Sequence, residues 1–217
     1  MRHHGSRHLT VLSALAAAAI FTPRAATAET FQPARITAAR DTAVFAGGCF
    51  WGVQAVFARV KGVSSSISGY AGGQAANPSY EEVSTGTTGY AESVRVIYDP
   101  AIVSYDQLLA VFFTVAHDPT ELNYQGPDHG TQYRSAIFFR NSAQQHAATA
   151  FIAGLTRAKK YAHPIVTQVA PLGVFYSAEA YHQDFFDKNP DYPYIVINDK
   201  PKVEHLRQQF PELYTGR

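Results

Sequence analysis

Cysteine and methionine are nearly absent from this 217-residue sequence, which has one of each, Cys49 and Met1. A single cysteine excludes a disulfide within the chain and a zinc site of four thiolates. Charge is also scarce, at 16% of residues with a formal net charge of +1, and there is no long basic arm or acidic tail. Nucleic-acid binding through charge alone is therefore not expected. The 46% hydrophobic content is instead typical of a globular domain with a sizeable core.

The amino-terminal segment has the pattern of a secretory signal peptide. Arg2 and Arg7 precede an uncharged, mostly apolar run at residues 9–21, and an alanine–threonine–alanine triplet at 26–28 follows as a cleavage site. The apolar run is too short to span a bilayer comfortably. We therefore expect cleavage after Ala28, a periplasmic or secreted protein, and no membrane association after cleavage.

The rest of the chain is expected to hold a tether at 29–41 and a single folded domain at 42–217. Hydrophobic periodicity in the first part of this domain predicts strands at 42–46, 63–70, 93–98 and 135–139 and helices at 49–60 and 105–116. The resulting β-α-β-β-α-β order is that of an α+β, ferredoxin-like split β-α-β core. Such a core has two helices packed on one face of a mixed four-stranded sheet.

Further elements form C-terminal extensions of this core. Helices are predicted at 142–159, 178–189 and 202–210, with short strands at 166–169 and 174–176. Ser104 and Gln107 have capping-box spacing and are expected to open the helix at 105–116. The polar segment 117–134 has no structural periodicity, and loops of this length are usually functional or disordered.

Cys49 follows two glycines at the predicted start of a helix. Free N–H groups and the helix dipole favour an anion there, so the position is expected to lower the pKa of the thiol. Gly47 and Gly48 allow a sharp bend and are expected to leave space above the sulfur. A buried structural cysteine is the alternative.

Five sequence blocks stand out in order along the domain. They read GCFWG at 48–52, YEEV and GTTGYAE within 80–92, HDPT at 117–120, GPDHGTQYRS at 126–135 and AEAYHQ at 178–183. Together they resemble the A-type peptide methionine sulfoxide reductases. The resemblance implies one catalytic domain at 42–217 that repairs oxidative damage. Its substrate would be methionine-S-sulfoxide, either free or in oxidised proteins.

The resemblance assigns the reacting groups. Cys49 matches the nucleophile that attacks the sulfoxide sulfur and becomes a sulfenic acid. Glu92 matches the acid that protonates the departing oxygen, which requires a pKa raised by an apolar, partly closed pocket. Tyr80 and Tyr133 match the phenols that hydrogen-bond the sulfoxide oxygen, in the manner of an oxyanion hole.

The resemblance also assigns the residues that bind substrate. Phe50 and Trp51 match the apolar wall that receives the S-methyl group. Asp128 matches an acidic residue that fixes the substrate or the pocket, although it could equally be a loop carboxylate that caps a turn. Tyr90 stands where histidine is expected in most relatives, and we expect a modest effect of this difference on substrate access or on the acidity of Glu92.

Regeneration of the enzyme needs a partner, because many relatives use a second cysteine near the C-terminus and this sequence has none. An external thiol must therefore reduce the Cys49 sulfenic acid. A thioredoxin-like or glutaredoxin-like protein or a small thiol could serve. We expect no bound cofactor, no metal, no nucleic-acid partner and a monomer.

Two other interpretations follow from the residues. A cysteine hydrolase could combine Cys49 with His117 or His182 and with Asp118 in a Cys-His-Asp set, and it would leave Glu92 dispensable. A secreted binding domain could use an aromatic groove around the single tryptophan, and in that case the thiol would not matter.

Overall fold

The computed structural model describes residues 1–2 and 40–216. The expected signal peptide and most of the expected tether lie outside the described residues. Among the residues that are described, no helix is long and apolar enough to cross a membrane. The folded unit begins with its first strand at Asp41, one residue before the predicted strand.

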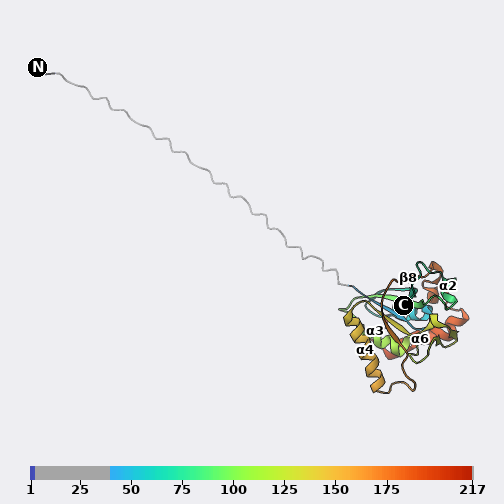
Figure 1. The fold of residues 1–217 in the computed structure, drawn as a ribbon. Helices are drawn as coiled ribbons and strands as arrows, with labels where there is room; N and C mark the ends of the chain where they lie inside the picture. The colour runs from blue at the N-terminus through green and yellow to red at the C-terminus, as the bar shows by residue number, and fades with distance from the viewer. Residues whose placement is uncertain (3–39, 217) are drawn as a thin grey trace. The chain divides into compact units, whose positions relative to one another are not determined.

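A six-stranded sheet forms the centre of this unit (Figure 1). Its order is β7-β6-β1-β3-β2-β8. The strands are β1 (Asp41–Ala46), β2 (Val63–Ala71), β3 (Ala91–Tyr98), β6 (Ala136–Phe139), β7 (Gln168–Pro171) and β8 (Tyr176–Ser177). The inner four strands, β6-β1-β3-β2, have the order of a ferredoxin-like core, which confirms the predicted fold class.

The mixed character of the sheet comes from an added strand. All pairs within the four-stranded core are antiparallel. β7 joins β6 in parallel, and β8 covers only Gly69 and Tyr70 at the outer edge of β2. The prediction of a mixed four-stranded core was therefore wrong in this detail, because the parallel pair lies in the C-terminal extension.

Helices pack on one face of the sheet. They are α1 (Phe50–Ala58), α3 (Tyr105–Val111) with its π-helical continuation η1 (Phe112–Ala116), α4 (Ser142–Arg157) and α6 (Lys200–Gln209). α3 and α4 lie side by side (Figure 1). The Phe45 ring stacks on Phe57 at 5.1 Å and on Phe112 at 4.9 Å, so aromatic contacts join β1 to two helices. Ser104 and Gln107 form the predicted capping box.

The opposite face of the sheet is covered by an irregular segment. Val44 and Phe138 point to this face and are buried beneath Leu172 and Phe175. Both faces are therefore apolar. This explains why consecutive β1 residues from Ala43 onward are all buried.

Short elements build the loops at one end of the sheet. They are α2 (Tyr80–Ser84), β4 (Tyr124–Gln125), β5 (Asp128–His129) and η2 (Thr131–Tyr133). The polar segment 117–134 is thus an ordered hairpin and a 3-10 turn. The hairpin pairs Tyr124 with His129.

The single helix predicted at 178–189 is wrong. Two short elements, η3 (Ala180–His182) and α5 (Phe185–Lys188), flank Asp184, which has a left-handed φ of 55°. Gln183 between them bonds the edge of β2: its Oε1 accepts from the Ser68 N–H, and its Nε2 donates to the Ser68 carbonyl. These long-range bonds replace the helical ones. The last helix also starts earlier than predicted, after the π-helical turn η4 (Ile195–Asp199).

Candidate active site

Cys49 is the N-cap residue of α1, at the turn that connects β1 to this helix. The turn is tightly packed, because a Cβ on Gly48, whose φ is +85°, would lie 2.5 Å from Gln125 Cγ. A Cβ on Gly47 would lie 2.9 Å from His117 Cγ. The glycines therefore make room for two neighbouring side chains, and Cys49 is only 8% exposed.

The electrostatic surroundings of Cys49 oppose the thiolate. Burial raises the pKa of the thiol well above its usual range, and the nearby Glu92 and Asp199 carboxyl groups raise it further. The Trp51 N–H and the Lys202 ammonium lower this pKa by smaller amounts. The predicted lowering of the pKa was therefore wrong in direction, because the helix terminus is outweighed by burial.

Glu92 lies directly beside this turn. It comes from β3, is 3% exposed, and its Oε2 accepts a hydrogen bond of 3.0 Å from the Phe50 N–H. Burial raises the pKa of Glu92 to about 8, with the Phe50 N–H opposing this shift. The predicted rise is thus present in the structure, and the carboxyl group holds its proton at neutral pH.

Two phenols are close enough to Glu92 and Cys49 to be affected by their charges. Tyr80 is the first residue of α2, and Tyr133 ends η2. Burial raises the pKa of each phenol, followed by the Glu92 charge and by a smaller effect of Cys49. Both hydroxyl groups therefore stay protonated and are able to donate hydrogen bonds.

Asp128 is connected to the surroundings of Cys49 through Tyr194, a residue that sequence reasoning missed. The Tyr194 hydroxyl donates a hydrogen bond to Asp128 Oδ2. Burial raises the pKa of Asp128, and this bond lowers it. Burial and the charge at Cys49 raise the pKa of Tyr194, so this phenol also lies near the sulfur. Among 13 tyrosines, nothing in the sequence distinguished Tyr194.

The two aromatic residues after the cysteine have different environments. Phe50 is 1% exposed and lies 5.0 Å from the His182 ring, so it belongs to the core beneath the site. Trp51 is half-buried, and its indole stacks on Phe185 at 3.8 Å. Trp51 Nε1 donates to His182 Nδ1 at 3.1 Å, which fixes the orientation of the indole.

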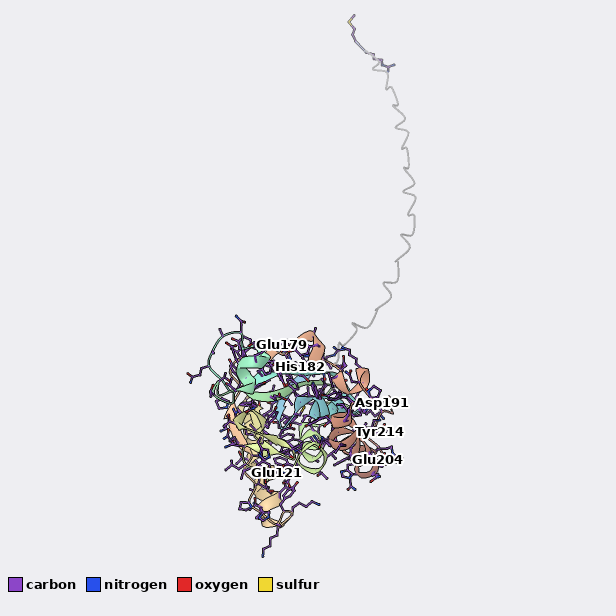
Figure 2. The ribbon with its side chains drawn as sticks, turned by 90° about the vertical axis from the view of Figure 1, so that its right-hand side faces the viewer. Glu121, Glu179, His182, Asp191, Glu204 and Tyr214 are labelled. Carbon is purple, nitrogen blue, oxygen red and sulfur yellow. The ribbon has the colours of Figure 1, made fainter. Side chains whose placement is uncertain are left out.

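Glu179 is a second residue that sequence reasoning missed. Its Oε2 accepts a hydrogen bond of 2.8 Å from the Tyr70 hydroxyl, and its Oε1 accepts one of 2.9 Å from the Tyr80 N–H. Figure 2 shows Glu179 next to His182, three residues along the same segment. This segment therefore holds two neighbouring parts of the chain in place. Glu179 binds the start of α2, and His182 binds the Trp51 indole.

The candidate histidines do not form a cysteine–histidine pair. Within the described chain, neither His117 nor His182 is hydrogen-bonded to Cys49. His117 is bonded to the Phe112 carbonyl and the Ser135 hydroxyl, and burial lowers its pKa to about 4. The geometry therefore gives no support to the hydrolase interpretation. The described residues also contain no group of three or more His, Cys, Asp or Glu side chains that could hold a metal ion.

Tyr90 supports a loop next to the site. It is 1% exposed, and its hydroxyl donates to the Ala75 carbonyl. A Cβ on Gly73 would lie 2.3 Å from the Tyr90 ring, so the glycine loop packs directly on it. The structure therefore shows Tyr90 holding this loop through both its hydroxyl group and its ring.

Comparison with known proteins gives a consistent picture. The family model "Peptide methionine sulfoxide reductase" matches residues 41–214. The chain is 59% identical over 177 residues to peptide methionine sulfoxide reductase MsrA 2 of Mesorhizobium japonicum, covering 82% of this chain and 91% of that protein. It is 49% identical over 178 residues to the MsrA 2 of Synechocystis, with coverages of 81% and 83%.

Solved structures are similar as well. Mxr1 from Saccharomyces cerevisiae in reduced form aligns with a TM-score of 0.65 and 35% identity, covering 70% of this chain and 87% of that one. Methionine sulfoxide reductase A of Corynebacterium diphtheriae aligns with a TM-score of 0.62 and 37% identity, covering 70% and 76%.

Proposed function

The chain belongs to the peptide methionine sulfoxide reductase family and is an oxidoreductase that reduces methionine sulfoxide, and on that premise we propose how its residues perform the reaction. The observation that carries the proposal is the pairing of Cys49 with a buried carboxyl group. Glu92 has a pKa of about 8 and lies at the same helix terminus as the sulfur.

In the first step, the Cys49 sulfur attacks the sulfoxide sulfur and forms an S–S bond, while the oxygen leaves as water with the thiol proton and the Glu92 proton, since general acid catalysis is required for a poor leaving group. Water then attacks the Cys49 sulfur, the S–S bond breaks to release methionine, and a proton returns to Glu92. The net change is that the thiol and the sulfoxide become a Cys49 sulfenic acid and methionine. The sulfoxide is reduced by two electrons, and the cysteine sulfur is oxidised by two.

Hydrogen bonds hold the sulfoxide for this step. Tyr80 and Tyr133 donate from their protonated phenols to the sulfoxide oxygen, where negative charge develops. Asp128, held by Tyr194, fixes the side of the pocket. Trp51 forms the wall that contacts the S-methyl group, with Phe50 beneath it. The likeness to A-type enzymes supports a preference for the S epimer.

An external thiol completes the cycle. It attacks the sulfenic sulfur and releases water, which leaves a mixed disulfide with Cys49. A second thiol equivalent then breaks this bond and regenerates the Cys49 thiol. The donor is a thioredoxin-like or glutaredoxin-like protein or a small thiol, because the sequence contains no second cysteine.

Export is part of the same proposal. The apolar run at 9–21 and the triplet at 26–28 support a cleaved signal peptide and a periplasmic or secreted enzyme that acts as a monomer. Mass spectrometry of the protein recovered from the periplasm or medium tests this. A chain that begins at Glu29 is expected, and an intact Met1 would refute it.

Single-turnover reduction tests the chemistry. The purified mature protein is mixed with the separated S or R epimer of a methionine sulfoxide peptide, first without thiol and then with dithiothreitol. About one equivalent of methionine is expected from the S epimer alone, with a sulfenic acid trapped at Cys49 and turnover only after thiol addition. No methionine from either epimer by a folded, reduced protein would refute the proposal.

A further inference from the structure

A buried ion pair lies against the first turn of α1. Asp199 is fully buried at the end of η4, and its Oδ1 accepts a hydrogen bond of 3.1 Å from Lys202 Nζ. The Lys202 side chain is only 18% exposed. A Cβ on Gly52 would lie 2.1 Å from Asp199 Oδ1 and 2.9 Å from Lys202 Nζ, so only glycine allows both charges to touch the helix.

The contact with Gly52 brings the pair close to the nucleophile. Gly52 is three residues after Cys49, which corresponds to about 4.5 Å along a helix axis. Asp199 Oδ2 is buried and has no hydrogen-bond partner in the described part of the chain. A buried carboxylate with one oxygen unpaired acts strongly on neighbouring charges, even with a cation at its other oxygen.

Groups from several elements affect the charge on the Cys49 sulfur. Glu92 and Asp199 oppose a thiolate, and Lys202 favours it, with Asp199 acting more strongly than Lys202. The charge on the sulfur also affects the pKa values of three phenols, Tyr80, Tyr133 and Tyr194. The pKa of Asp128 is affected in turn by Lys202 and Tyr194. Lys202 is the one of these groups that carries a positive charge.

We propose that Asp199 and Lys202 are positioning residues that set the charge on the Cys49 sulfur, Asp199 by disfavouring the thiolate and Lys202 by offsetting Asp199. The inference rests on the proposed role of Cys49 as nucleophile. Its consequence is a resting thiol that stays protonated.

Removal of each charge is expected to move the pH midpoint of thiol ionisation in opposite directions. A purely structural role of the two residues would not give opposite shifts. Replacement of Asp199 by asparagine keeps the shape and removes the negative charge, so the pH midpoint of thiol ionisation falls. Replacement of Lys202 by methionine removes the cation and leaves Asp199. Burial raises the pKa of Asp199, but it also raises the pKa of the Cys49 thiol well above its usual range, so the carboxyl loses its proton first and stays charged while the thiol titrates. The midpoint therefore rises in this variant.

Alkylation of the full-length protein tests the proposal without any sulfoxide. The rate of iodoacetamide reaction at Cys49, the single thiol in the sequence, is followed by mass spectrometry from pH 7 to pH 11. We expect a downward shift of about 1 pH unit for Asp199→Asn and a smaller upward shift for Lys202→Met. Lys200→Met is the matched control, because Lys200 lies on the same helix in an exposed pair with Asp191 at 3.9 Å.

Shifts in opposite directions, with none for Lys200→Met, would support the proposal. Shifts in the same direction, or no shift in either variant, would overturn it. Circular dichroism identifies folded variants. If Asp199→Asn does not fold, the proposal is decided by whether the pH midpoint of alkylation rises in Lys202→Met. Because the assay needs no reductase activity, its failure is distinct from a failure of the proposed function, which appears as absent methionine release.

Discussion

The raised pKa of Glu92 predicts that this residue makes the fold less stable as the pH rises. The folded-state pKa is about 8 against an ordinary value of 4.5. A carboxyl group shifted upward contributes its stability in full below pH 4.5 and loses it as the pH rises through 8, because the folded state holds the proton longer. Glu92→Gln keeps a neutral acceptor for the Phe50 N–H and removes the titration.

The magnitude follows from these two pKa values. Linkage makes the stability of the wild-type protein fall relative to Glu92→Gln by roughly 2 to 3 kcal/mol between pH 6 and pH 8.5. Urea unfolding, monitored by tryptophan fluorescence from Trp51, measures the free energy of unfolding of both proteins at each pH. Glu212→Gln, at an exposed position, serves as the control and is expected to show a constant difference from wild type.

A difference between wild type and Glu92→Gln that stays constant over this pH range would refute the reasoning. It would mean that Glu92 is already ionised at pH 6 in the folded protein. The same variant gives a kinetic readout, since loss of a general acid is expected to slow single-turnover reduction about 100-fold or more.

Three further predictions concern the surroundings of the acid. Cys49→Ser is expected to abolish methionine release in the single-turnover assay while the thermal melt stays that of a folded protein, and retained activity would contradict the nucleophile assignment. Glu179→Ala is expected to lower kcat several-fold through displacement of Tyr80, whose N–H loses its acceptor, as measured by steady-state kinetics with dithiothreitol, and unchanged kcat would contradict the positioning role. Tyr90→Phe is expected to cost about 1 kcal/mol in urea unfolding because the Ala75 carbonyl loses its donor, and the pH profile of reduction should not move.

The strands and first two helices could be predicted from the sequence because local pattern determines them. β3 alternates buried and less buried residues from Val94 to Tyr98, and the capping box at Ser104 marks a helix start that depends on neighbours three residues away. The segment 178–189 could not be predicted in this way. Gln183 gives up helical geometry to bond Ser68, which is 115 residues distant.

The site shows the same division. The blocks around Cys49, Glu92 and Asp128 were recognisable, and the structure brings these residues together at one end of the sheet. The direction of the thiol pKa was not predictable from the helix start, because burial and carboxyl groups from other elements determine it. Asp199 belongs to this second class, since its influence depends on packing against a glycine 147 positions earlier in the sequence.

The segment around Gln183 also links the edge of the sheet at Ser68 to the Trp51 indole, so that loss of one contact is expected to weaken the other. The Gln183 amide occupies the place of a neighbouring strand at Ser68, and the adjacent residues His182 and Phe185 hold the Trp51 indole. We therefore expect fraying of the sheet at this edge to release the Trp51 indole, the proposed substrate wall, in the same event, as one cooperative opening unit. Hydrogen exchange at the Ser68 amide, which Gln183 protects, would then report on how often this proposed binding site opens.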